Sequence, residues 1–143
     1  MKIYLDNCCY NRPFDDQSDI VIRLETEAKL FIQQKVKENA LELVWSFILD
    51  YENSRNPFED RRERIGLWRN LSSDDCILSE SVKDKANKLM TSLGLKQMDA
   101  AHIACAIEKR ADYFITTDRK ILNKQVEGIS IASPTIFVQE FFI

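Results

Sequence analysis

Glycine and proline are scarce in this 143-residue sequence, with three of each, and they are scattered along the chain. Three scattered glycines cannot build a glycine-rich phosphate loop, so chemistry driven by a nucleotide is not expected. No segment is repetitive or rich in glycine, proline or serine, so nothing reads as a linker. We therefore expect one domain over residues 1–143, which is long enough to bury a hydrophobic core.

Long hydrophobic runs are also missing. No apolar segment approaches the roughly 18–20 residues that a membrane-spanning helix requires. The first residues, MKIYLDNCCYNRP, are interrupted at Asp6 before the apolar region of a signal peptide could form. We expect a cytoplasmic protein with no membrane segment.

Histidine occurs once, as His102, which excludes a metal site built from several histidines. The cysteines have irregular spacing and no CxxC pair, so we expect small buried thiols in a reducing compartment. They are Cys8, Cys9, Cys76 and Cys105. Any metal ion bound here is then expected to have oxygen ligands.

The net charge of −3 excludes a basic coat for nucleic acid over the whole domain, but not a local basic surface.

Apolar patterning alternates between short strands and amphipathic helices, which predicts an α/β fold with a parallel sheet covered on both faces. The expected strands are residues 3–5, 41–45, 75–78, 113–116 and 129–132, with a polar turn at 11–19. The expected helices are residues 20–36, 46–56, 57–70, 79–94, 97–110 and 118–125, and one that Pro134 opens. Ser46 caps the second of these helices, and Gly94 ends the fourth.

Four acids lie at comparable points of this pattern. Asp6 and Asp118 each end a strand, Glu52 lies two turns into the helix after the second strand, and Asp99 lies near the start of an apolar helix. Ligands of parallel sheets bind beyond the carboxyl ends of the strands, where these acids converge if the first and fourth strands are neighbours. Clustered carboxylates repel one another unless a cation lies among them, which indicates Mg²⁺ or Mn²⁺. Such ions assist hydrolysis of a phosphodiester.

Each acid also has an ordinary structural interpretation. Asp99 and Asp118 could be helix N-caps, Asp6 a turn residue, and Glu52 an exposed helical glutamate.

Three segments resemble the PIN-domain family: KIYLDNCCYNRP, LVWSFILDYEN and MDAAHIACAIEKRADYFITTD. The resemblance covers residues 2–135 and is most specific from Met98 to Asp118. It implies a three-layer α/β/α sandwich with a central, mostly parallel five-stranded sheet. It also implies a metal-dependent endoribonuclease, which in many members is the toxin of a VapC-type toxin–antitoxin pair.

Carried over residue by residue, the resemblance implies the following site. The Mg²⁺ or Mn²⁺ ligands are Asp6, Glu52, Asp99 and Asp118. Ser46 matches the family's serine at the end of the second strand, Thr116 or Thr117 matches the hydroxyl beside the last acid, and Asn7 lies beside the first.

The sequence departs from the family pattern at its start, where Asn7 follows Asp6 directly and Cys8 takes the position of the usual asparagine. Asp50 competes with Glu52, because two positions apart on a helix they face about 200° away from each other. The spacing from the serine favours Glu52. His102 is expected in the core beside the acids, with a catalytic base as the alternative.

A local excess of arginines follows Glu52 and predicts an RNA-binding flank, with an aromatic ring that can stack on a base. The candidates are Arg55, Arg61, Arg62 and Trp68. The alternative is a solvated helix with internal ion pairs. The aromatic end of the chain, TIFVQEFFI, either closes the core or meets a second subunit in a homodimer.

The sequence thus predicts a Mg²⁺- or Mn²⁺-dependent endoribonuclease with an RNA substrate and a cognate antitoxin. One alternative is a catalytically silent PIN-like module that binds RNA or protein. Another is a metal-dependent phosphatase, which is disfavoured because Asn7 and Cys8 follow Asp6 where a second aspartate is needed.

Overall fold

A five-stranded sheet lies at the centre of the structure, a computed structural model that describes residues 1–142. The strand order is β3-β2-β1-β4-β5, and every neighbouring pair is parallel. The strands are β1 (Lys2–Leu5), β2 (Glu42–Ser46), β3 (Asp74–Cys76), β4 (Tyr113–Ile115) and β5 (Ser130–Ala132). The predicted α/β class is confirmed, and the sheet described is parallel throughout.

Strand β1 occupies the middle of the sheet, where Tyr4 pairs with Val44 on one side and Phe114 on the other. Parallel pairing brings the carboxyl ends of β1, β2 and β4 to one edge of the sheet. The amide of Asp6 continues the ladder by donating to the carbonyl of Ile115 at 2.9 Å. The first and fourth strands are therefore neighbours, which was the condition for the acids to converge.

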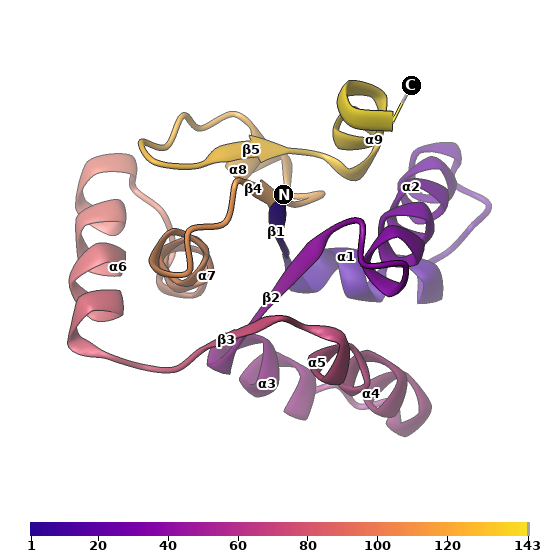
Figure 1. The fold of residues 1–143 in the computed structure, drawn as a ribbon, viewed down its shortest axis with the longest axis horizontal. Helices are drawn as coiled ribbons and strands as arrows, with labels where there is room; N and C mark the ends of the chain where they lie inside the picture. The colour runs from indigo at the N-terminus through magenta and orange to yellow at the C-terminus, as the bar shows by residue number, and fades with distance from the viewer. Residues whose placement is uncertain (143) are drawn as a thin grey trace.

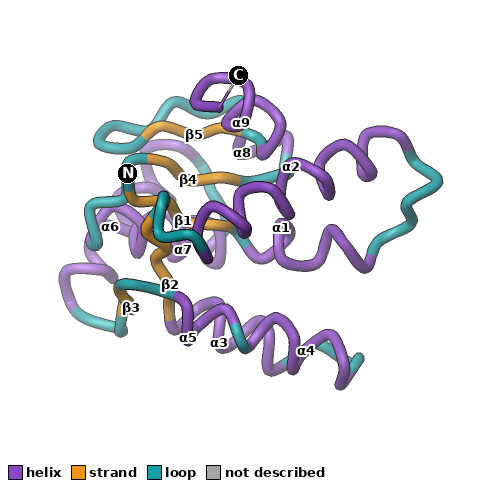
Figure 2. The backbone as a smooth tube through the Cα atoms, turned by 45° about the vertical axis from the view of Figure 1, so that its right-hand side comes forward, coloured by secondary structure: helices purple, strands orange, loops and turns teal. Residues whose placement is uncertain are grey.

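Helices cover both faces of the sheet (Figure 1). Helices α6 (Glu80–Leu93) and α7 (Gln97–Glu108) pack together on one face, and α2 (Ile20–Lys37) and α9 (Pro134–Phe142) on the other. The remaining short elements are α1 (Asn7–Asn11), η1 (Arg12–Phe14), α3 (Phe47–Ser54), α4 (Glu59–Gly66), α5 (Trp68–Leu71) and α8 (Arg119–Leu122). Figure 2 shows α2 and α4 extending past the strands on the side where β1 leads into α1.

Several predicted helix boundaries are present. Ser46 Oγ accepts from the amide of Leu49 at 3.2 Å and caps α3. Gly94 ends α6 with a φ of 66°, a left-handed conformation that glycine adopts without steric cost. Helix α7 is buried on nearly all sides, as its apolar sequence predicts.

Two predicted segments differ from the structure near prolines. The turn expected at residues 11–19 is helical over its first four residues, because the Asp6 side chain caps α1 by accepting from the amide of Asn7 and η1 continues to Phe14. The expected helix over residues 57–70 is two helices, and it begins later, at Glu59. The Asn56 side chain accepts from the amide of Phe58 at 3.1 Å and forms a turn there instead.

Two predicted ends are also wrong. Strand β3 stops at Cys76, and Ile77 and Leu78 are exposed rather than paired in the sheet. Helix α8 stops at Leu122, three residues before the predicted end.

The cysteines are all free thiols, and the predicted burial holds for three of them. Cys8 is only half-buried, and it lies beside Cys9 in helix α1. Over residues 1–142, no helix combines the length and apolar character that crossing a membrane demands.

The aromatic end of the chain closes the core. Phe137 in α9 is fully buried, and the rings of Phe142 and Phe31 lie 5.2 Å apart, so α9 is packed against α2. Phe141 remains 40% exposed.

Candidate metal centre

The four acids lie around the edge at which β1, β2 and β4 end. Asp6 directly follows β1, and Asp118 follows β4 by two threonines. Glu52 reaches the edge from α3, and Asp99 from the first turn of α7. The topology therefore brings four carboxylates from four separate segments to the same edge of the sheet.

Asp6 is 7% exposed and is held on both carboxylate oxygens. Thr116 Oγ donates to Oδ2 at 2.8 Å, and the amide of Asn7 donates to Oδ1 at 2.8 Å. The same Thr116 hydroxyl accepts from the amide of Asp118 at 3.1 Å. One threonine thus fixes the first and last acids relative to each other, which explains a hydroxyl in this position.

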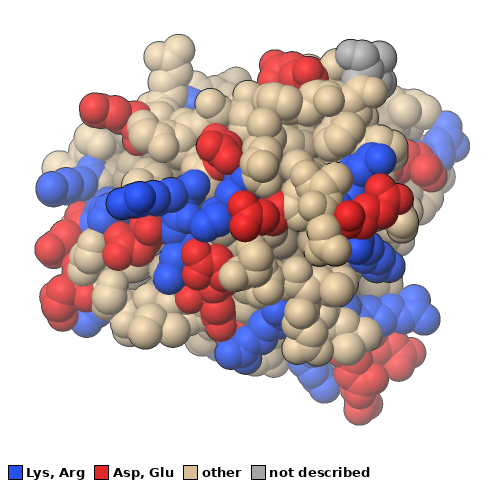
Figure 3. Space-filling model, in the orientation of Figure 1, with Lys and Arg blue, Asp and Glu red and all other residues tan. Residues whose placement is uncertain are grey.

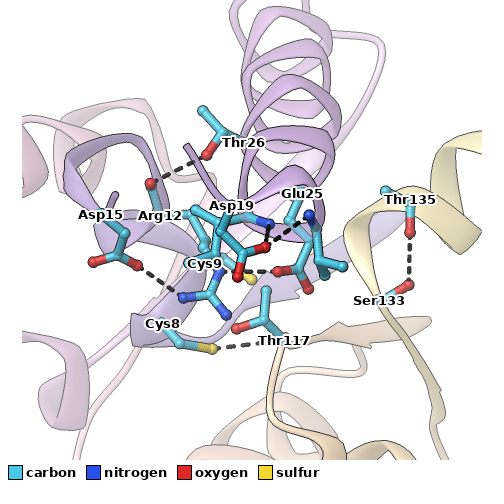
Figure 4. Close-up of polar contacts among 12 residues, drawn as sticks. Cys8, Cys9, Arg12, Asp15, Asp19, Glu25, Thr26, Thr117, Ser133 and Thr135 are labelled. Atoms are coloured by element: carbon cyan, nitrogen blue, oxygen red, sulfur yellow. Dashed lines mark hydrogen bonds and ion pairs between the residues drawn. The ribbon is translucent and has the colours of Figure 1, made fainter. Parts of the chain in front are cut away.

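Cys8 and Thr117 add further contacts between the segments that follow β1 and β4. Cys8 Sγ lies 3.4 Å from Thr116 Oγ, and it accepts from the amide of Thr117 at 3.4 Å (Figure 4). The thiol therefore fills the space between the two chain segments, and Cys8 is a site residue that the sequence did not assign.

Arg12 connects the segment after α1 to helix α2 (Figure 4). Its guanidinium pairs with Asp15 at 2.8 Å and with Glu25 on α2 at 3.0 Å, while its carbonyl accepts from Thr26 at 3.1 Å. These contacts hold η1 on α2 and thereby fix α1, which carries Asn7.

Glu52, rather than Asp50, faces the cluster. Its Oε1 contacts His102 Nε2, and its Oε2 accepts from Asn7 Nδ2 at 3.3 Å. Asp50 turns away: it accepts from the indole of Trp45 at 2.9 Å and lies 3.6 Å from the guanidinium of Arg69.

His102 is fully buried and connects Glu52 to the sheet. Its Nδ1 lies 2.6 Å from the hydroxyl of Tyr4, which lies 2.6 Å from Ser46 Oγ. Ser46 therefore reaches the acids only through this chain of contacts. Burial alone would lower the pKa of His102, but the contact with Glu52 and the charge of Asp6 raise it above its ordinary value.

Tyr4 was not predicted as a site residue. The available signal was a hydroxyl on a strand buried on both faces, since such a group requires a hydrogen-bond partner. Its partners lie 42 and 98 residues away, which local patterning cannot reveal.

Asp99 does not cap α7, because the N-cap position is Lys96. Burial, followed by the negative charges of Asp6 and Asp118, raises the pKa of Asp99. Asp118 does cap α8, accepting from the amide of Lys120 at 2.9 Å. The N-cap interpretation is thus excluded for Asp99 and correct for Asp118. The second carboxylate oxygen of Asp118 forms no hydrogen bond or ion pair within residues 1–142.

The donor set suits a hard divalent cation in its chemistry. It consists of carboxylate oxygens, and the Asn7 Oδ1 amide oxygen is buried there without a hydrogen-bond partner. In residues 1–142, however, no three Asp, Glu, His or Cys side chains lie close enough together to share an ion as they stand. His102 Nε2 lies between Glu52 and Asp6 Oδ1, at 3.8 Å from the latter. An ion shared by these acids would need their carboxylates to move closer together, with Glu52 leaving His102.

The predicted RNA-binding residues contact their own chain. Arg55 lies over the ring of Tyr51, and Arg61 over the ring of Phe58 at 4.0 Å from its centroid. Arg62 donates to the carbonyl of Asn56, and Lys29 and Lys37 lie over the ring of Trp68.

Comparison with known proteins identifies the fold. No protein-family model and no curated protein matches the sequence. A solved structure is similar, that of VapBC2 from Rickettsia felis bound to a DNA fragment from the promoter. The two chains share 13% sequence identity, and their TM-score is 0.59. The match covers 93% of this chain and 98% of that one. The chain has a PIN-like fold. At this identity the likeness concerns the fold, and the site must be argued from its own residues.

Proposed function

We propose that this protein is a Mg²⁺- or Mn²⁺-dependent endoribonuclease that hydrolyses phosphodiester bonds of RNA. The observation that carries the proposal is the convergence of Asp6, Glu52, Asp99 and Asp118 at the carboxyl edge of a parallel sheet. Burial, and then the negative charges of Asp6 and Asp118, raise the pKa of Asp99. His102, which lies between Asp6 and Glu52, partly offsets these negative charges, yet the pKa of Asp99 remains raised.

The metal-holding residues would be the four acids, with Asn7 Oδ1 as a further oxygen donor. When bound, the ion supplies Lewis acidity toward a phosphoryl oxygen and a water nucleophile near neutral pH. The chain contributes the positions of the ligands. Thr116 and the Asn7 amide fix Asp6, and His102 and the Asn7 side chain orient Glu52.

A catalytically silent PIN-like module is the second candidate, and one observation favours it. His102 lies where Glu52 and Asp6 would otherwise meet around an ion, so the side chains form no preassembled ion cage. Such a module would bind RNA or protein without hydrolysis and without a requirement for metal.

A cleavage assay with the purified protein separates the two candidates. Labelled single-stranded RNA is incubated with Mg²⁺, Mn²⁺ or EDTA, and with the Asp6→Asn and Asp99→Asn variants. We expect cleavage only with metal, and a loss of at least about 100-fold in each variant. Asp84→Asn is the matched control, because Asp84 is exposed on α6 and forms no side-chain contact in the described chain. Wild-type rates in Asp99→Asn would exclude the proposed site.

We further propose that the protein acts as the toxin of a toxin–antitoxin pair. The fold it shares with a VapBC2 chain supports this proposal. Expression of the chain alone should then arrest growth, whereas Asp99→Asn should not, and the product of an adjacent gene should restore growth. Equal toxicity of the wild type and Asp99→Asn would separate toxicity from RNA cleavage.

A further inference from the structure

A cleft of about 660 Å³ opens directly beside two of the four acids. It lies between the turn that joins α6 to α7 and the segment that follows β4. Its lining comprises Gly94, Leu95, Lys96, Asp99, Asp118, Lys120, Ile121, Asn123 and Lys124. The cleft is therefore continuous with the candidate metal centre through Asp99 and Asp118.

Three lysines in this lining have no partner among the described residues. Within the described residues, the ammonium groups of Lys96, Lys120 and Lys124 form no ion pair and no side-chain hydrogen bond. On the neighbouring helix α6, by contrast, Lys83 and Lys85 pair with carboxylates at 3.5 and 2.6 Å. The cleft thus gathers cations whose charge the chain leaves uncompensated.

The face seen in Figure 3 is different, because its cations are interleaved with acids. At the start of β1, for example, Lys2 and Lys109 both pair with Asp74, at 3.3 and 3.2 Å. Asp74 thus compensates both charges, so these two lysines offer less to an external anion than the cleft does.

The electrostatic role of the cleft follows from its position. Four carboxylates repel the phosphates of a nucleic acid from the site at which one of them has to be cleaved. Three lysines against two aspartates give the cleft a formal excess of one positive charge. Helix α7 also begins here without a side-chain cap, so the amides of its first turn add to the positive potential.

We propose that this cleft binds the phosphodiester backbone of single-stranded RNA next to the bond that is cut. The inference rests on the proposed ribonuclease activity and places the substrate on the side of α7 and α8. Arg55, Arg61 and Arg62, the arginines first predicted to bind RNA, instead lie over rings of the chain itself or donate to its backbone. Lysine ammonium groups recognise phosphate as point charges, so the cleft selects for backbone and not for base sequence.

The test is RNA binding by a triple variant, Lys96→Gln with Lys120→Gln and Lys124→Gln. Fluorescence anisotropy of a labelled oligouridine is measured in EDTA over a series of salt concentrations. We expect roughly tenfold weaker binding near 0.1 M salt, and a salt slope lower by about 2, since each phosphate contact on a single strand contributes about 0.7. The triple Lys→Arg variant keeps the charge and should retain wild-type binding.

Two controls separate a specific effect of the cleft lysines from a general loss of charge or of metal binding. Lys88→Gln removes an exposed lysine that lines a different cavity, on α6, and should leave RNA binding unchanged. Mn²⁺ affinity of the triple variant should stay within about twofold of wild type, because lysines do not ligate the ion.

Two results together would overturn the proposal and place RNA on α4. The triple Gln variant would bind RNA as the wild type does, and a variant with Arg61→Gln and Arg62→Gln would lose binding. A wild-type protein that binds no oligouridine would also overturn it. Failure of the proposed activity is a separate result, namely absence of metal-dependent cleavage by the wild type.

Discussion

The hydroxyl of Tyr4 lies 2.6 Å from His102 Nδ1, and the opposite ring nitrogen of His102 contacts Glu52. A carboxylate only accepts hydrogen bonds, so Nε2 carries a proton and Tyr4 occupies the remaining nitrogen. Tyr4 on the central strand therefore fixes which nitrogen of His102 faces Glu52, a candidate metal ligand. His102 is thus a positioning residue in this account.

Tyr4→Phe tests this relationship with the ring retained, because the ring also stacks on Phe114 at 5.4 Å. We expect Mn²⁺ affinity to fall about tenfold, the range found when a partner of a metal ligand is lost. Stability should fall by about 1 kcal/mol for the lost hydrogen bonds. Calorimetric Mn²⁺ titration and urea unfolding measure the two effects separately. If Tyr4→Phe lowers stability but leaves Mn²⁺ affinity at the wild-type value, Tyr4 contributes to packing and not to the position of His102.

Glu52→Gln and Asp50→Asn should differ sharply. Glu52 faces His102 and Asn7, so its substitution should weaken Mn²⁺ binding by tenfold or more. Asp50 contacts Trp45 and Arg69, so its substitution should change Mn²⁺ affinity less than about twofold and affect stability instead. A loss confined to Asp50→Asn would reverse the assignment.

Lys29 should make stability depend on pH. It is 3% exposed, and burial lowers its pKa to about 7. The unfolded chain keeps this proton up to about pH 10.4, so between these values the unfolded state binds more protons and stability rises with pH. Below pH 7 the cost of charging Lys29 is fully present.

Lys29→Met should therefore stabilise the protein at pH 7 by on the order of 2 kcal/mol and flatten the rise toward pH 10. The new side chain can pack between the rings of Tyr10 and Trp68, over which the ammonium group now lies at 5.6 and 5.8 Å. Guanidinium unfolding at several pH values measures both effects. An unchanged pH profile would show that Lys29 titrates normally.

Asp99→Asn should raise the melting temperature of the metal-free protein. Burial and the charges of Asp6 and Asp118 raise the pKa of Asp99, so its ionised form is disfavoured in the folded state at neutral pH. The penalty should shrink as pH falls below the folded pKa and vanish near the unfolded pKa of about 3.9, where the wild type and the variant converge. Scanning calorimetry in EDTA at pH 4 and pH 7 checks both points. Lower stability of Asp99→Asn at pH 7 would contradict mutual repulsion in the cluster.

The sheet and the location of the acids were predictable because both depend on local patterning. Alternating strands and helices force a parallel sheet, and Asp6 and Asp118 end strands that register places side by side. Which face of α7 meets α3 is not local, and so the contact of His102 with Glu52 could not be read from the sequence.

The segment after Asp6 shows a second limit. Its polar residues and Pro13 are typical of a turn, yet the Asp6 side chain caps a helix that places Asn7 against Glu52. A tertiary requirement outweighed local preference at a point that belongs to the candidate site. The cleft that Lys96, Lys120 and Lys124 line was not predicted for a related reason. Lys96 and Lys120 are far apart in the sequence and come together only in the folded chain.

The central claim, that the four carboxylates form one cation site, is tested most directly by a crystal structure of the protein grown with Mn²⁺. Anomalous scattering locates the ion without reference to activity. We predict a peak about 2.1 Å from oxygens of Asp6, Asp99 and Asp118, with Glu52 turned toward it from His102. Crystals saturated with Mn²⁺ that show no peak among these residues, with Glu52 still on His102, would contradict the account.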